Sequence, residues 1–256
     1  LDRTTEAGDL DFATDARPDD IRAIVDDWAH DLYLAGQNFG TIGAIRDGMV
    51  YEITTYRSEV YREDSRKPVV RVSDDIDTVL SRRDFSVNGM AIRIPGGGET
   101  PEMIDPYGGL ADLATQTLRC PLDPHISFGD DPLRMLRAAR FIAGYQLAPN
   151  PELVDAVREL APRLEIVSAE RIRDELSRIL ISPRRLRGFD LLVESGLMAI
   201  IIPEILDLKG CDQPPQFHPE GDVFVHTRLM IELLNEEASL PLVLAVLLHD
   251  IGKPAT

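Results

Sequence analysis

The chain has 256 residues, 44% of them hydrophobic, which is enough for one or two globular domains with sizeable cores. With 27 Lys and Arg against 44 Asp and Glu, the formal net charge of −17 excludes attraction of nucleic acid or an anionic membrane by overall charge. The apolar stretches are shorter than the ~20 residues of a spanning helix, and Cys120 and Cys211 suggest neither a disulfide framework nor a paired thiolate motif. We expect a cytoplasmic protein that does not associate with membranes.

The first strand is predicted near the N-terminus. Residues 9–13, DLDFA, alternate so that Asp9 and Asp11 share one face of a strand and Leu10 and Phe12 the other. Two acidic residues on one strand face are unusual, because aspartate is a poor strand former.

A helix and two hairpins are predicted next. Pro18 stands in the first turn of a helix that carries Trp28. The dipeptide at 47–48, Asp-Gly, is typical of a tight turn between strands at 41–45 and 49–57. We interpret the three glycines at 96–98 as a second hairpin loop, because no helix start follows them, as a phosphate-binding loop would require.

From about residue 130 onward the periodicity is almost entirely helical. The sequence DDP at 130–132 predicts a helix start, with proline at the first helical position. A proline-rich segment at 209–221 is expected to be a linker. Further helices are predicted at 151–160, 169–181, 185–195, 224–235 and 240–250. The overall pattern indicates an α+β fold.

Asp9 and Asp11 are candidate metal ligands. Two carboxylates on one strand face can share hard cations, and a pair of Mg²⁺ ions aligns a hydroxyl with a nucleoside triphosphate in known enzymes. Glu52, on a neighbouring hairpin strand, could be a third ligand. The alternatives are a solvated outer strand face for the aspartates and a simple cross-strand contact for Glu52.

Two polar clusters could bind a nucleotide. Residues 82–88, RRDFSVN, combine guanidinium groups suited to phosphate with an amide suited to a sugar or base edge. Asp131 and Arg134 are three residues apart on the expected helix, with Arg137 and Arg140 on the same ridge, and together offer acceptors and donors to a base edge. The alternatives are a surface ion-pair turn and a helix cap with an ion pair.

Six motifs occur in a fixed order along the chain. They are GDLDFATD at 8–15, EITTYR at 52–57, RRDFSVNGMA at 82–91, DPYGGLADL at 105–113, DDPLRMLRAARF at 130–141 and ERIRDEL at 170–176. This series resembles the class II tRNA nucleotidyltransferases, or CCA-adding enzymes, and the bacterial poly(A) polymerases related to them. The resemblance covers essentially the whole chain and implies a polymerase-β-type nucleotidyltransferase head at 1–115, a helical neck and RNA-binding region at 116–208, and a linker with the beginning of an HD-type helical domain at 209–256.

The resemblance also implies roles for motif residues. The catalytic Mg²⁺ ligands would be Asp9 and Asp11, with Glu52 a weaker candidate. The ribose and phosphates of the incoming nucleotide would contact Arg82, Asp84 and Asn88. The base would be read by Asp131 and Arg134, supported by Arg137. Glu170 and Arg171 match a helix-stabilising motif.

The chain departs from the family pattern in two places. The family's glycine-rich motif with Arg-Asp is expected just before Asp9, where this chain has LDRTTEAG at 1–8, so we expect an N-terminal piece of the head to be missing and polymerising activity to be impaired. In the base-reading motif, the first acid is Asp130 where the family often has glutamate.

A second set of residues lies near the C-terminus. His226, His249 and Asp250, followed by IGKP at 251–254, resemble the HD-domain phosphohydrolases. Neutral imidazole and carboxylate can together bind a second divalent metal. A further Asp ligand is expected beyond residue 256. The alternative is that these histidines only form structural hydrogen bonds.

The predicted function is template-independent nucleotide addition to an RNA 3′ end, in which CCA is added to tRNA from CTP and ATP with Mg²⁺. Within the same class, CC-only, A-only and poly(A) addition stay open. Two further alternatives are an HD-type metal-dependent phosphohydrolase with a vestigial head, and an RNA-binding remnant without catalysis.

Overall fold

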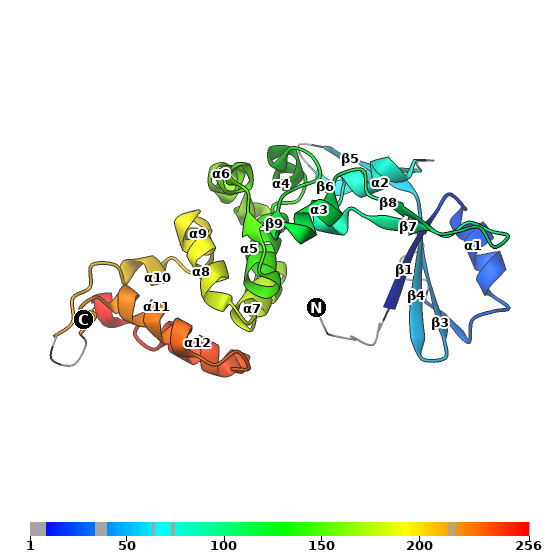
Figure 1. Ribbon diagram of the computed structural model, residues 1–256. Coiled ribbons are helices and arrows are strands. Elements are labelled where there is room, and N and C mark those ends of the chain that lie inside the picture. Colours follow the sequence, from blue (N-terminus) through cyan, green and yellow to red (C-terminus); the bar gives the residue numbers. More distant parts are fainter. Residues whose placement is uncertain are drawn as a thin grey trace. The chain divides into compact units, whose positions relative to one another are not determined.

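The computed structural model describes residues 9–33, 40–62, 65–72, 75–214, 216 and 219–255. The chain divides into two compact units, Leu1–Arg82 and Arg83–Thr256, called here the first and second units. The first unit contains a mixed sheet with two helices, whereas the second is mainly helical (Figure 1). This composition confirms the predicted α+β class.

The first unit is built on a four-stranded sheet in the order β1-β4-β3-β2. The strands are β1 (Asp9–Thr14), β2 (Asp31–Tyr33), β3 (Thr41–Arg46) and β4 (Met49–Thr55). β1 runs parallel to β4, and the other neighbours are antiparallel. Between β3 and β4, Asp47 and Gly48 have φ angles of 52° and 81°, the two positive values that a type I′ turn requires. The predicted hairpin is therefore confirmed.

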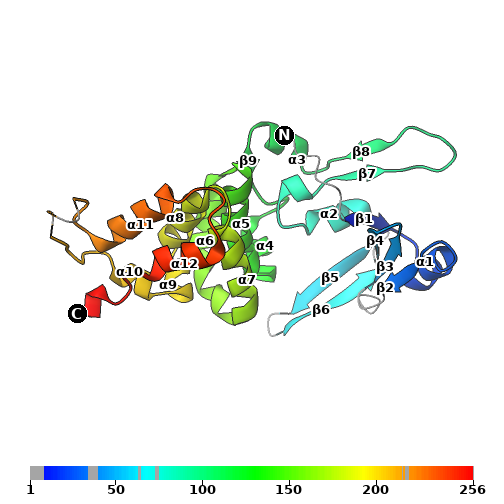
Figure 2. The same ribbon diagram turned by 90° about the horizontal axis from the view of Figure 1, so that it is seen from below.

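Helix α1 (Pro18–Val25) covers one face of this sheet (Figure 2). Its two buried residues lie one turn apart and pack against apolar residues of β3. Burial of each large aliphatic side chain contributes about 1.5–3 kcal/mol to the stability of the fold. This core consists of Ile21, Val25, Ile42 and Ala44. Trp28 lies beyond the helix, contrary to the prediction, and packs edge-on against Tyr51 with ring centroids 4.9 Å apart. The opposite face of the sheet can therefore carry polar side chains.

An antiparallel ribbon and a short helix complete the first unit. The ribbon is formed by β5 (Arg57–Arg62) and β6 (Ser65–Val72). Helix α2 (Ile76–Ser81) follows, and Asp75 caps it by accepting hydrogen bonds from the backbone N–H groups of Asp77 and Thr78 at 3.1 and 3.2 Å. Asp75 thereby satisfies two of the N–H groups that a helix start leaves unpaired.

The second unit begins with short elements. They are η2 (Ser86–Asn88), β7 (Ala91–Arg93), β8 (Glu102–Ile104), α3 (Gly109–Ala114) and β9 (Thr117–Leu118), which pairs with β10 (Ala148–Pro149). The antiparallel pair β7–β8 projects as a hairpin (Figure 2), which confirms the loop predicted at the three glycines. A Cβ on Gly109 would lie 2.2 Å from the carbonyl oxygen of Ser86, so only glycine permits α3 to approach η2 this closely.

The remaining second unit is helical. The helices are α4 (Pro124–Asp130), α5 (Leu133–Tyr145), α6 (Pro151–Leu160), η3 (Ala161–Ile166), α7 (Ala169–Leu180), α8 (Arg185–Glu194), α9 (Leu197–Ile201), α10 (Glu204–Asp207), α11 (Val223–Leu233), α12 (Leu240–Leu248) and η4 (Lys253–Ala255). α5 packs against α7 and α8, and one apolar core runs through the unit. The five helices predicted after residue 150 are confirmed, with ends shifted by at most two residues.

Helix α4 was not predicted, although it ends directly where the next predicted helix begins. It is capped by Asp123, whose carboxylate accepts from the backbone N–H of His125 at 2.8 Å, and it has a proline at its first position. Its seven residues are too few for a hydrophobic period to be recognised. In the part of the chain that the structure describes, no helix is both long and apolar enough to cross a membrane.

Candidate active site

Two carboxylates lie next to each other on the sheet of the first unit. Asp11 of β1 pairs in register with Glu52 of β4, which in turn pairs with Gly43 of β3. Residues paired directly across strands share one face, and neighbouring strands are about 4.8 Å apart. Asp9 occupies the strand position two residues before Asp11, at the level of Val50. The structure thus places all three predicted metal-ligand positions together.

The shared face is the one that α1 leaves open. Tyr51 and Ile53, the neighbours of Glu52 along β4, contribute to the core on the other face, while Asp11 and Glu52 are exposed. Like charges opposite each other on adjacent strands repel. Because hard divalent cations prefer carboxylate oxygens, a cation held between these two groups would turn that repulsion into attraction.

Asp84 is the centre of a hydrogen-bonded cluster in the second unit. It is 7% exposed, and its Oδ1 accepts from Asn88 Nδ2 and from the backbone N–H of Phe85, both at 2.9 Å. Its Oδ2 accepts from Arg137 Nε at 2.7 Å. Three predicted nucleotide-binding residues are therefore in contact, and Arg82 lies at the end of α2 in the first unit.

Glu175 of α7 is an acidic partner that the sequence analysis missed. It is 6% exposed, and its carboxylate lies 3.2 Å from Arg140 Nε, 3.9 Å from Arg137 Nη1 and 3.8 Å from Arg178 Nη1. Burial lowers the pKa of Arg140, and the charge of Glu175 opposes that effect. Arg137 is thus held between two buried acids. The ERIRDEL motif contains three acidic residues. Which of them faces the arginines of α5 depends on how α7 packs against α5, and the sequence alone does not show this.

Asp131 and Arg134 lie at the junction of α4 and α5. Asp131 Oδ1 accepts from the backbone N–H of Leu133 at 3.2 Å, and Oδ2 lies 3.1 Å from Arg171 Nη2. Arg134 donates from Nη1 to Ser127 Oγ at 2.8 Å, and its backbone N–H donates to the Asp131 carbonyl at 3.0 Å. Both predicted base-reading residues are therefore anchored by neighbouring elements, and both are partly exposed.

A second polar network ties α3 to the motif that contains Asp84. Ser86 Oγ donates to Asp112 Oδ2 at 2.5 Å, and Arg119 Nε donates to Asp112 Oδ1 at 3.0 Å. Arg119 also donates to the Tyr107 carbonyl. Asp105 accepts from two backbone N–H groups at the start of α3. These contacts fix the DPYGGLADL segment to η2, and the spacing of the motifs alone did not predict them.

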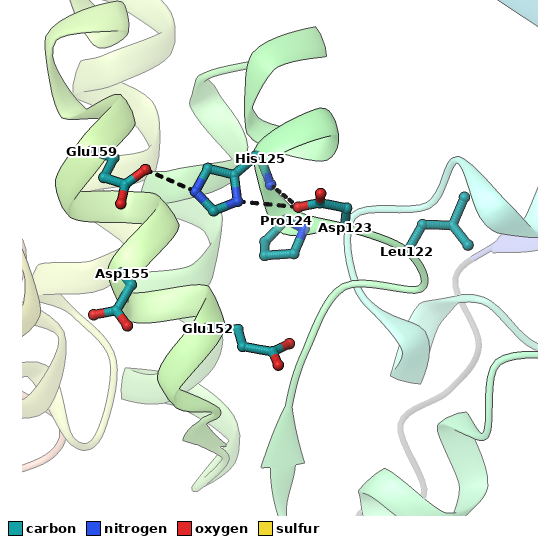
Figure 3. A pocket seen from close by; sticks show the side chains of 7 residues that line it. All are labelled: Leu122, Asp123, Pro124, His125, Glu152, Asp155 and Glu159. Carbon is teal, nitrogen blue, oxygen red and sulfur yellow. Dashed lines mark hydrogen bonds and ion pairs between the residues drawn. The ribbon is translucent and has the colours of Figure 1, made fainter.

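A pocket of about 520 Å³ lies between the start of α4 and α6 (Figure 3). It is lined by Leu122, Asp123, Pro124, His125, Glu152, Asp155 and Glu159. His125 bridges two carboxylates, with Nε2 3.0 Å from Glu159 Oε2 and Nδ1 3.1 Å from Asp123 Oδ1. Four carboxylates would repel a triphosphate, so this pocket is not the nucleotide site.

The His125 bridge predicts a pH-dependent contribution to stability. Hydrogen bonds to Glu159 first, and then to Asp123, raise the pKa of His125 above its ordinary value of 6.5. A raised folded-state pKa stabilises the fold below the unfolded-state pKa, and this contribution is lost as the pH rises through the folded value. Urea unfolding of the parent chain and His125→Gln should therefore differ most below pH 6.5 and converge above the folded pKa. A difference that grows with rising pH would contradict this assignment.

His226, His249 and Asp250 come together between α11 and the end of α12. One ligand atom from each lies within 4.8 Å of the others. His226 Nδ1 contacts Glu220, and Asp250 Oδ2 lies 2.7 Å from Lys253 Nζ. Two imidazoles and a carboxylate are a suitable donor set for a divalent transition metal.

Two family models match this chain, and both describe parts of poly(A) polymerases. The family "Poly A polymerase head domain" matches residues 1–119, and the family "Probable RNA and SrmB- binding site of polymerase A" matches residues 146–208. The first match includes the carboxylate face and the Asp84 motif, and the second includes α7 with Glu175. The predicted domain boundaries after residues 115 and 208 stay predictions.

The curated relatives of this chain include proteins whose names refer to CCA or to its addition. The "Multifunctional CCA protein" of Ectopseudomonas mendocina (strain ymp) is 40% identical over 199 residues, which are 74% of this chain and 45% of that protein. The "CCA-adding enzyme" of Geobacillus sp. (strain WCH70) is 34% identical over 206 residues, 80% of this chain and 48% of the relative. The chain is therefore a homologue of the CCA-adding tRNA nucleotidyltransferases, which confirms the resemblance. It spans about half the length of the curated relatives it matches.

Solved structures agree with this assignment. The Bacillus stearothermophilus CCA-adding enzyme in complex with CTP is 32% identical, with a TM-score of 0.64 over 74% of this chain and 44% of that one. The Thermotoga maritima CCA-adding enzyme complexed with tRNA has a TM-score of 0.63 over 88% of this chain and 53% of that one, and at 23% identity it shows a shared fold. The HD-type domain stays a prediction.

Proposed function

We propose that this chain transfers nucleotides, without a nucleic-acid template, from CTP and ATP to the 3′ end of tRNA, and so builds CCA. The single observation that carries the proposal is the pairing of Asp11 with Glu52 on the face of the sheet that α1 leaves open. Asp9 precedes Asp11 by two residues in the same strand. The proposed substrates are inferred from the names of the relatives and of the similar solved structures. A cytoplasmic location also stays a prediction.

The donor set on this sheet fits a pair of Mg²⁺ ions, which, when bound, would neutralise phosphate charge and lower the pKa of the RNA 3′-hydroxyl. Asp9 and Asp11 would hold them, with Glu52 as the third carboxylate. The 3′-hydroxyl gives its proton to water, its oxygen forms a bond to the α-phosphorus, the bond from that phosphorus to the bridging oxygen breaks, and pyrophosphate leaves. Such a transfer depends on positioning and charge stabilisation, so the proposed chemistry does not require a covalent enzyme intermediate.

Arginine and amide groups would hold the nucleotide. In the proposal, Arg82 contacts phosphates, because a guanidinium group binds phosphate oxygens in pairs, Asn88 contacts the ribose, and Arg137 supports the base-reading pair. Asp84 is buried and accepts hydrogen bonds from both Asn88 and Arg137. We therefore assign Asp84 a positioning role instead of the direct ribose or phosphate contact that the motif resemblance implies.

Asp131 and Arg134 suit the selection of C and A. Cytosine and adenine both present an amino donor beside a ring-nitrogen acceptor, whereas uracil and guanine present a carbonyl oxygen beside a ring N–H. A carboxylate that accepts from the amino group and a guanidinium that donates to the ring nitrogen would therefore favour C and A. Pairs of this kind discriminate by about 1–3 kcal/mol.

A nucleotide-incorporation assay tests the proposal. The four nucleoside triphosphates are supplied one at a time with Mg²⁺ to tRNA that lacks its last three, two or one nucleotides. Incorporation of C onto the first two substrates and of A onto the third supports CCA addition. C alone, A alone, or a long A tail would identify the alternative members of the same class, and tRNA binding without incorporation would favour an RNA-binding remnant.

We infer a second candidate function, divalent metal binding by His226, His249 and Asp250, from the proximity of their ligand atoms. His249→Ala should weaken binding of Mn²⁺ or Ni²⁺, measured by calorimetry, by at least about 10-fold, because one of three ligands is lost. His125→Ala is the matched control, since His125 lies outside this cluster. Hydrolysis of 2′,3′-cyclic phosphates to monoesters, or release of inorganic phosphate from terminal phosphates, that survives Asp11→Ala but not His249→Ala would favour an HD-type phosphohydrolase. Equal metal affinity in the parent and in His249→Ala would leave these histidines a structural role only.

A further inference from the structure

Ser127 contacts both base-reading residues. It lies in α4, four residues before Asp131, and its carbonyl accepts the backbone N–H of Asp131 at 3.2 Å. Its Oγ accepts from Arg134 Nη1 at 2.8 Å. One buried residue of α4 therefore contacts the backbone of Asp131 and the guanidinium of Arg134.

The surroundings of Ser127 fix its hydroxyl. The residue is 8% exposed and lies against the buried thiol of Cys120. Burial raises the pKa of Cys120 to about 12, with a hydrogen bond from Ser127 as the largest opposing effect, so the thiol stays neutral. Since the oxygen of Ser127 accepts from Arg134, its own proton can point to the Cys120 sulfur. Both hydrogen-bonding functions of the hydroxyl are then used, which restricts its rotation.

We propose that Ser127 is a positioning residue that fixes the guanidinium of Arg134 and thereby strengthens the discrimination of C and A from U and G. This inference rests on the proposed function. An arginine side chain loses rotamer freedom when it binds a base edge, and a hydrogen bond made in advance reduces that loss. A guanidinium held in one orientation also cannot turn to match a wrong edge, so uracil or guanine leaves polar groups unpaired.

Equilibrium binding of the four nucleoside triphosphates tests the proposal. Calorimetry with Mg²⁺ gives the affinity ratio of CTP to UTP and of ATP to GTP for the chain, and Ser127→Ala is expected to lower both ratios by at least about 10-fold, the effect of losing one hydrogen bond to a charged group. Ser127→Thr keeps the hydroxyl and should keep the ratios. If Ser127 had a role in folding only, Ser127→Ala would lower the affinity for all four nucleoside triphosphates by the same factor, and this result would overturn the proposal.

Two controls separate positioning from general damage. Ser195→Ala removes another buried serine hydroxyl, which donates to the Leu191 carbonyl at 2.6 Å, and should leave the ratios unchanged. In the Arg134→Ala background, Ser127→Ala should have no further effect on the ratios, because the group it positions is gone.

The outcomes distinguish the two levels of inference. Ratios retained in Ser127→Ala, or lowered equally with and without Arg134, overturn the role of Ser127 alone. If the unaltered chain binds no nucleotide or binds all four equally, the proposed function fails and the role of Ser127 fails with it.

Discussion

Asp11→Asn is expected to reduce nucleotide incorporation by at least about 1,000-fold, because it removes charge where a cation and the transferred phosphate must be held. The substitution keeps the shape of the side chain and lies on the exposed face of β1, away from the core under α1. Removing one of two opposed like charges should leave the free energy of unfolding unchanged or slightly increased. Single-turnover incorporation with Mg²⁺ and urea unfolding measure these two effects.

Two variants sharpen this test. Asp20→Asn changes an exposed acid on α1, on the other side of the same sheet, and should leave incorporation unchanged. Glu52→Gln should give an intermediate loss if Glu52 is the third carboxylate. An Asp11→Asn protein that retains a tenth or more of the parental rate would contradict the metal-binding role.

The elements that the sequence predicted well have strong local signals. The hairpin at Asp47 and Gly48 needs two positive φ angles, which this dipeptide readily supplies. The alternation around Asp9 and Asp11 fixed the polar face of β1, because a side-chain period of two permits only one assignment once Leu10 is placed on the core side. Helices after residue 150 were predicted from their apolar periodicity alone.

The contacts of the candidate site depend on the packing of distant segments instead. Asp84 and Arg137 are 53 residues apart, and neither residue type reveals its partner. Arg137 and Arg140, which the sequence places on one helix ridge, pair with the buried acids Asp84 and Glu175. Residue types alone cannot separate arginines that face solvent from those that hold a neighbouring acid.

Asp84→Ala is expected to destabilise the second unit and to weaken nucleotide binding. It removes a 7%-exposed carboxylate that accepts hydrogen bonds from Arg137, from Asn88 and from the backbone of Phe85. Breaking a buried ion pair from one side costs about 3–5 kcal/mol, and since the side chain of Arg137 is 31% exposed and keeps Glu175 as a neighbour, we expect about 2–4 kcal/mol here. Urea unfolding of the second unit measures this loss, and affinity for CTP should fall with it.

The pair of Asp190 and Arg228 provides the matched control. Arg228 Nε and Nη2 donate to Oδ1 and Oδ2 of Asp190 at 2.8 and 2.7 Å, and the side chains of Asp190 and Arg228 are 28% and 41% exposed. Exposed ion pairs contribute about 0–1 kcal/mol, so Asp190→Ala should cost at most about 1 kcal/mol and leave CTP affinity unchanged. If Asp84→Ala and Asp190→Ala lowered the free energy of unfolding by the same amount, the burial of Asp84 would not strengthen its contact with Arg137. Full stability with lost CTP affinity would instead assign Asp84 to the nucleotide directly, because a carboxylate that only positions Arg137 and Asn88 must also stabilise the fold that holds them.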